Sequence, residues 1–210
     1  MNTITINKKL LAACTIIAPK ADVPYYLRGA LVHIRPQGSR LVVTDGHRMI
    51  VADLPLGEDE MAPETEAQYT IPRDVIEKIK KMKVSTVALE LADAPMLSNV
   101  VGDSTEYFKC VDGKFPDYER VIPLKASGEI GCYNVDYAAD FKKFAVQAFG
   151  HKNCTGNGFT LHQNGTGPAF VEFDNTSAFG ILMPMRGNLG GGFTMPTWYA
   201  PPKDSKRKAA

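Results

Sequence analysis

The feature that most limits how this chain can fold is an internal repeat. Three segments of similar pattern pass through Ile6, Ile71 and Tyr133, at spacings of 65 and 62 residues. Each is a short run of residues that favour β-structure, followed by a residue suited to start a helix and by apolar residues at helical spacing. The sequence therefore predicts three copies of one small unit.

The helical patterns indicate which faces pack inward. The apolar positions are Leu10, Leu11, Cys14 and Ile17 in the first unit, Val75, Ile76, Ile79 and Met82 in the second, and Ala138, Phe141, Ala145 and Ala148 in the third. Asn7 and Asn134 are suited to cap helix starts, because the side-chain oxygen accepts from a free backbone N–H. Pro72 suits the first helical turn, and Pro19 is expected to end the first helix.

Runs that predict strands follow each helix. They lie at 30–34, 40–43 and 49–54 in the first unit, at 86–91, 97–101 and 105–111 in the second, and at 158–162, 169–173 and 178–183 in the third. Turn residues separate the first three runs, with Pro36–Ser39 and then Asp45–Gly46. Each unit is expected to have the order β-α-β-β-β, which makes the fold class α+β.

Composition excludes several functions. The 210 residues carry a net charge of +1, so any contact with nucleic acid must come from local charge. The four cysteines form no CxxC pair, and no phosphate loop or catalytic triad is present, so neither a metal, a cofactor nor catalysis is expected. His47 beside Asp45 is interpreted as part of a turn. No leader or membrane-spanning run is found, which favours a cytoplasmic protein.

Four motifs in order resemble the bacterial DNA polymerase III beta subunit, the beta sliding clamp. They are VPYYLRG at 23–29, TDGHRM at 44–49, DGKFPDYERVIP at 112–123 and MPMR at 183–186. Residues 1–123 resemble the middle domain of that family, and 128–186 resemble the second half of its last domain. Residues 187–210, rich in Gly, Pro and basic residues, are expected to form a flexible tail.

The resemblance implies a DNA-clamp fold, with helices lining an inner face and antiparallel sheets outside. Family members form a ring around duplex DNA, bind it without reading sequence, and tether a polymerase. The resemblance places nine lysines toward DNA: Lys8, Lys9, Lys20, Lys78, Lys80, Lys81, Lys142, Lys143 and Lys152. An ordinary solvated helix face is the alternative for these lysines.

The family also binds peptides of polymerases and clamp loaders in a pocket. Matching motifs carry that pocket to Leu27, Thr44, Gly46, His47, Arg48, Met49, Pro116, Arg120, Val121, Asn134, Tyr137, Ile181, Met183, Pro184, Met185 and Arg186. The apolar members would take Leu and Phe side chains, and Arg48 and Arg186 would contact carbonyl or carboxylate oxygens. Asn134 could do the same if it does not cap its helix.

Three repeats leave one without a partner, because two such units normally complete one domain. The sequence therefore predicts a homo-oligomer in which third repeats pair, with a tetramer of twelve repeats favoured over a dimer. The alternative function is a peptide-binding adaptor or decoy that keeps the pocket and does not encircle DNA.

Overall fold

The computed structural model describes residues 2–21, 23–55, 65–91, 96–98, 105–150 and 158–186. The first repeat comprises β1 (Asn2–Asn7), α1 (Lys8–Ala13), the 3-10 turns η1 (Cys14–Ile16) and η2 (Tyr25–Leu27), β2 (Gly29–Ile34), β3 (Ser39–Thr44) and β4 (Arg48–Leu54). The second comprises β5 (Ala67–Pro72), α2 (Arg73–Lys81), β6 (Thr86–Leu91), β7 (Met96–Ser98) and β8 (Thr105–Tyr107). After the 3-10 turn η3 (Tyr118–Val121), the third comprises α3 (Val135–Phe149), β9 (Thr160–His162), β10 (Ala169–Glu172) and β11 (Ala178–Leu182).

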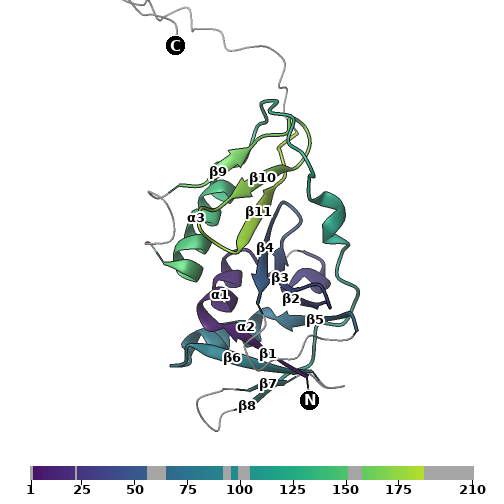
Figure 1. Ribbon diagram of the computed structural model, residues 1–210, viewed down its shortest axis with the longest axis vertical. Coiled ribbons are helices and arrows are strands. Elements are labelled where there is room, and N and C mark those ends of the chain that lie inside the picture. The colour runs from purple at the N-terminus through teal and green to yellow at the C-terminus, as the bar shows by residue number, and fades with distance from the viewer. Residues whose placement is uncertain are drawn as a thin grey trace, which may run out of the picture.

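Two antiparallel sheets carry the fold. The larger runs through all three repeats in the order β5-β2-β3-β4-β11-β10-β9, and the smaller has the order β1-β6-β7-β8. The third repeat joins the first through β11 and β4, with Gly180 opposite Ile50 at the centre of the pairing. The three helices lie together on one side of the large sheet, where α1 packs against both α2 and α3 (Figure 1). This confirms the mixed helix and antiparallel-sheet fold class.

The large sheet packs on both of its faces. Successive side chains of a strand point to opposite sides, so neighbouring residues enter different clusters. Residues such as Val32, Val43 and Ile50 pack with the helices in the main core. Leu31 and Val42 point the other way, into a second cluster that includes residues of η3 and of the segment before it. That second cluster lies next to the candidate site described below.

Local signals start the helices as expected. The Asn7 side chain accepts from the backbone N–H of Lys9 at 2.9 Å, and Asn134 accepts from that of Asp136 at 2.9 Å. Pro72 differs from its prediction, because it is the cap residue before α2 and not part of the first turn. Helix α1 also ends at Ala13, well before Pro19. The predicted inward faces are buried or, at Met82 and Ala138, half-buried.

The third repeat departs from the predicted order, because residues 132–134 form no strand. In the other two repeats the strand before the helix has a partner, since β1 pairs with β6 and β5 pairs with β2. The third repeat has no equivalent strand beside it among the described residues. The strand predicted at 105–111 is also shorter and ends at Tyr107. The predictions for 99–101, Lys152 and the tail at 187–210 lie outside the described residues.

Candidate binding site

A cleft of about 160 Å³ opens where β3, β4, β11 and the η3 segment meet. Its walls are mostly apolar and comprise Leu27, Thr44, Gly46, Arg48, Met49, Pro116, Asp117, Tyr118, Val121, Ile181 and Met183. Met49 and Ile181 lie opposite each other in the β4–β11 pairing, so the first and third repeats build one wall together. Two methionines in an apolar cleft suit a ligand with bulky apolar side chains.

The turn between β3 and β4 is held by its own side chains. The Thr44 hydroxyl accepts from the Gly46 N–H at 3.0 Å and donates to the Arg48 carbonyl at 2.8 Å. One Asp45 oxygen accepts from the N–H groups of His47 and Arg48 at 2.9 and 3.0 Å. Gly46 has φ +91°, which favours glycine. The TDGHR motif is thus a rigid turn at the rim of the cleft.

Arg48 fastens the first repeat to the third. Its guanidinium donates to Asp45 at 3.0 Å and to Asp140 of α3 at 2.5 Å, and it lies 4.5 Å from the ring centre of Tyr137. Burial alone would raise the pKa of Asp140, but hydrogen bonds and charge from Lys143 and Arg48 hold it below its usual value. Arg48 lines the cleft with two of its nitrogens already engaged, so its expected contact with a ligand remains a prediction.

Tyr118 lines the cleft but is not among the pocket residues predicted from the sequence. It is buried, and its hydroxyl lies 2.8 Å from Nδ1 of the buried His33. Nε2 of His33 lies 2.6 Å from Glu66. Tyr118 and the equally missed Asp117 belong to the DGKFPDY motif, which was the available signal. The motif thus places an anchored aromatic ring below the cleft.

Nine of the sixteen predicted pocket residues line this cleft: Leu27, Thr44, Gly46, Arg48, Met49, Pro116, Val121, Ile181 and Met183. The seven that do not are His47, Arg120, Asn134, Tyr137, Pro184, Met185 and Arg186. Of these, His47 and Tyr137 line a neighbouring cavity of about 430 Å³, where their rings stack at 5.5 Å. Asn134 caps α3, which occupies its side-chain oxygen.

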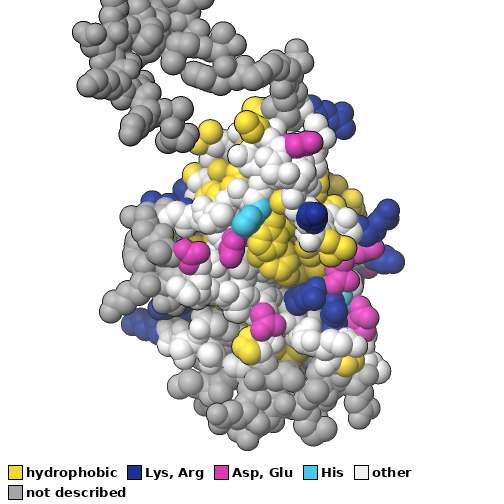
Figure 2. Space-filling model, turned by 45° about the horizontal axis from the view of Figure 1, so that its top comes forward, with side chains coloured by type: hydrophobic (Ala, Val, Ile, Leu, Met, Phe, Trp, Pro, Cys, Tyr) yellow, Lys and Arg dark blue, Asp and Glu magenta, His cyan; other side chains and the backbone are white. Residues whose placement is uncertain are grey.

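Apolar side chains also reach the surface. On the face shown in Figure 2, they gather in a continuous patch bordered by positively and negatively charged side chains. Met185 is 51% exposed and Val121 is 39% exposed. Large exposed apolar patches with a polar border are typical of interaction sites.

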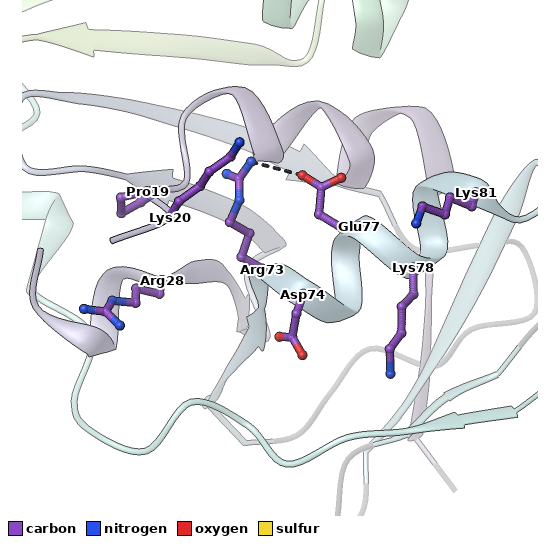
Figure 3. A pocket seen from close by; sticks show the side chains of 8 residues that line it. All are labelled: Pro19, Lys20, Arg28, Arg73, Asp74, Glu77, Lys78 and Lys81. Carbon is purple, nitrogen blue, oxygen red and sulfur yellow. Dashed lines mark hydrogen bonds and ion pairs between the residues drawn. The ribbon is translucent and has the colours of Figure 1, made fainter. Parts of the chain in front are cut away.

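A third, basic cavity of about 680 Å³ lies beside α2 (Figure 3). It is lined by Pro19, Lys20, Arg28, Arg73, Asp74, Glu77, Lys78 and Lys81. Three of these were predicted to face DNA, whereas Arg28 and Arg73 were not, because they belong to different elements that only the fold brings together. Five cations against two carboxylates make the cavity suited to anionic groups such as phosphates.

The arginines of this cavity are ordered by the chain itself. Arg73 donates to the Thr15 carbonyl at 2.6 Å and to Glu77 at 3.0 Å, which the dashed line in Figure 3 marks. Arg28 donates to the Val23 carbonyl at 3.1 Å. These contacts fix the positive charges in place.

The other lysines predicted to face DNA are either exposed or bonded to groups of the same chain. Lys9, Lys80 and Lys142 are exposed on the helices. The Lys8 ammonium instead donates to the Met82 carbonyl at the end of α2, and Lys143 pairs with Asp140 at 2.6 Å. These two lysines therefore have structural partners, and their contact with DNA remains a prediction.

Other site classes find no support in the described part of the chain. None of its His, Cys, Asp and Glu side chains form a group of three or more that could hold a metal ion. No helix within the same residues is long and apolar enough to span a membrane.

Comparison with known proteins matches the first part of the chain to one family. Residues 4–117 match the family described as DNA polymerase III beta subunit, central domain. The beta sliding clamp of Escherichia coli K12 is 32% identical over 135 residues, and that of Vibrio cholerae is 38% identical over 130 residues. Each match covers 60% of this chain, and the chain spans about a third, 34%, of the length of these relatives.

Solved structures extend the likeness of the fold to the third repeat. The DNA polymerase III subunit beta of Pseudomonas aeruginosa superposes with a TM-score of 0.67 at 18% identity, over 89% of this chain and 67% of that one. The Helicobacter pylori beta clamp, solved with a DNA ligase peptide bound, gives a TM-score of 0.66 at 13% identity, over 87% and 65%. With the family matched over more than half of its residues, this chain belongs to the DNA polymerase III beta subunit family, the bacterial beta sliding clamps.

Proposed function

We propose that this protein is a DNA sliding clamp, which encircles duplex DNA as an oligomeric ring and tethers a replicative polymerase through the apolar cleft. The observation that carries the proposal is the cleft itself. Motif residues from two distant parts of the chain, represented by Met49 and Met183, meet in one apolar groove beside a rigid turn. The protein acts as a scaffold and performs no chemistry.

The cleft would accept an extended peptide with Leu and Phe side chains. Its walls supply apolar contact area, and Thr44 and Arg48 at the rim offer polar groups for the peptide backbone. Because the walls come from one chain, peptide binding needs no second subunit.

A pair of matched variants tests the cleft. Met183→Ala removes a lining side chain, whereas Met185→Ala changes a half-exposed methionine two residues further on that does not line it. We expect Met183→Ala to weaken binding of a fluorescent clamp-binding peptide at least tenfold in an anisotropy titration. Met185→Ala should change it less than threefold. Equal effects, or none for Met183→Ala, would place the peptide elsewhere.

The helix side would face DNA. Lys20, Lys78 and Lys81 converge with two arginines in the basic cavity, and Lys9, Lys80 and Lys142 extend the positive surface along the helices. Such contacts attract phosphates without reading bases, which allows sliding. Four chains of three repeats would supply the twelve repeats expected of a clamp ring.

Topology separates the two functions that the cleft permits. A ring slides off linear DNA but stays on a closed circle, so retention on nicked circular plasmid should exceed retention on the linearised plasmid. Equal retention, together with peptide binding that is lost in Met183→Ala, would favour the adaptor. That alternative draws support from the cleft, which is complete within a single chain.

A further inference from the structure

The first two repeats are joined by two strand pairs, each with one strand from either repeat. The strand before α1 pairs with the strand after α2, with Asn7 opposite Thr86. The strand before α2 pairs with the strand after α1, with Pro72 opposite Gly29. In both cases the residue that caps a helix lies opposite the first residue of the strand that follows the other helix. Each repeat thus supplies the edge that the other needs.

The third repeat has both segments of this arrangement, but no described strand pairs with either of them. Strand β9 is the last strand of the large sheet, and no described strand pairs with its outer edge; just beyond its end, the Gln163 carbonyl accepts from the Gly128 N–H at 3.0 Å. Residues 131–134 precede α3, and no described strand pairs with them. The Cys132 carbonyl nevertheless accepts from Met185 N–H at 2.7 Å, as the Thr70 carbonyl in β5 accepts from Val111 N–H at 3.0 Å. Residues 131–134 therefore lie like β5 on one side. On the other side the Gly131 N–H donates to the Gln163 side chain at 2.9 Å, and no described strand pairs with residues 132–134.

The first residue of each helix also distinguishes the third repeat from the other two. Lys8 begins α1 and reaches the Met82 carbonyl at the end of α2. Arg73 begins α2 and reaches the Thr15 carbonyl beyond the end of α1. Val135 begins α3, where the equivalent contact would cross to the end of a fourth helix, and its apolar side chain is 79% exposed.

We propose that a second copy of this chain supplies the missing edge, so that two third repeats form one domain across a twofold axis. The exchange seen in the first two repeats fixes the register. Asn134, which caps α3, lies opposite the partner's Thr160, which begins the strand after the helix. Counting outward, Tyr133 lies opposite the partner's Leu161, and Cys132 opposite the partner's His162.

The chemistry of the two edges fits this pairing. Tyr133 and Leu161 are half-buried against the main core, so they occupy the helix-facing side of the new strand pair and would be covered by it. Cys132 and His162 are exposed on the opposite side. A twofold axis uses both open edges at once and leaves neither to pair with other chains. The first two repeats have already paired with each other, so the third repeat of another copy is the matching unit within this sequence.

A cysteine placed in the predicted register tests the pairing directly. Thr70 directs its carbonyl away from β2, so its pair with Leu31 is of the type without direct hydrogen bonds. Cys132 and the partner's residue 162 would form the same type of pair, with Cα atoms about 4.5 Å apart. That separation lies within the range for a disulfide. We expect His162→Cys to give a disulfide-linked dimer on mild oxidation of the full chain, read on a non-reducing gel.

Two controls test whether the cross-link depends on Cys132 and on position 162. Adding Cys132→Ser to His162→Cys should abolish the cross-link. Glu172→Cys places an exposed thiol one strand further in, opposite Thr160 in the β9–β10 pairing, and should remain uncross-linked. Equal cross-linking of Glu172→Cys, or none for His162→Cys, would overturn the proposed register.

Sedimentation equilibrium gives an independent reading. The parent chain should associate at micromolar concentration, and Val135→Glu should weaken that association at least tenfold. Leu124→Glu also replaces an exposed apolar residue by glutamate, between η3 and α3, and should leave the association unchanged. A single-chain mass for the parent at tens of micromolar would refute the pairing. The pairing deepens the proposed ring. Because neither reading uses DNA or peptide, the pairing can hold even if retention on circular DNA fails, whereas a single-chain mass would exclude the ring and leave peptide binding in the cleft untouched.

Discussion

Replacing Asp140 by asparagine should loosen the third repeat from the first. The Arg48–Asp140 ion pair joins the β3–β4 turn to α3, and the two side chains are only 10% and 17% exposed. Asparagine keeps the size of the side chain and can still accept a hydrogen bond, but it removes the charge. The variant therefore isolates the electrostatic part of this contact.

The expected cost follows from burial and from the contacts that remain. Exposed ion pairs contribute about 0.2–1 kcal/mol, and removing one partner of a fully buried pair costs about 3–5 kcal/mol. Arg48 is nearly buried but keeps Asp45 and the Tyr137 ring after the change, so it is not left without partners. Lys143 is 65% exposed and loses little. We expect the free energy of unfolding to fall by about 1.5–3 kcal/mol.

Urea unfolding of the single and double variants measures this. A double-mutant cycle with Arg48→Met should give a coupling energy of at least about 1 kcal/mol between Arg48 and Asp140. Lys143→Met, which removes the other partner of Asp140, should cost less than about 0.5 kcal/mol. A coupling energy near zero would show that packing, and not this ion pair, holds α3 to the turn.

The pH dependence of the same measurement has a defined sign. The pKa of Asp140 is lower in the folded chain than its ordinary value, so its contribution is present above about pH 4 and is lost as the pH falls through the folded pKa. The stability difference between the parent and Asp140→Asn should therefore shrink below about pH 4. A difference that stays constant down to pH 3 would contradict the assigned role of the charge.

Three further outcomes are expected. Gly180→Ala should destabilise the chain by about 1–3 kcal/mol in urea unfolding, because a Cβ there would lie 2.5 Å from the ring of the buried Phe141. Adding Phe141→Leu should recover part of that loss. Cys14 should resist alkylation until the chain unfolds, because burial raises the pKa of its thiol, whereas the exposed Cys132 should react in the folded chain, as mass spectrometry of labelled peptides can follow. Tyr118→Phe should cost about 1–2 kcal/mol in thermal unfolding, because it leaves a buried imidazole nitrogen without its partner.

The elements predicted best from the sequence are those fixed by neighbouring residues. The caps at Asn7 and Asn134 depend on bonds two or three residues away, and the buried helix faces depend on a period that the chain carries locally. A strand was predicted at 132–134 but does not form, although these residues belong to a β-favouring run like those that form β1 and β5. A strand also needs a partner, and whether one is present is decided by another repeat far away in the chain.

The site residues also fall into those that a local motif predicts and those that only the fold brings together. Motif residues such as Leu27 and Met183 line the apolar cleft, and their positions within the motifs were enough to predict that they lie together. Tyr118 was missed because its role depends on His33, which is 85 residues away in the sequence. Arg73 was missed because its place in the basic cavity depends on how α2 packs beside η1. Distances of this kind follow from the sheet order and cannot be counted along the chain.

The sheet order also explains how distant parts of the chain form one cleft. Its walls come from β3 and β4 of the first repeat, from the segment around η3 and from β11. Strand β11 pairs directly with β4 in the large sheet, with Leu182 opposite Arg48, so the two walls lie side by side. Strand β9, on which the proposed pairing depends, lies instead at the end of the same sheet, beyond β11 and β10. Peptide binding and assembly are therefore expected to respond to different mutations, Met183→Ala affecting the first and Val135→Glu the second. A variant at either position that impaired both would show that the cleft depends on assembly.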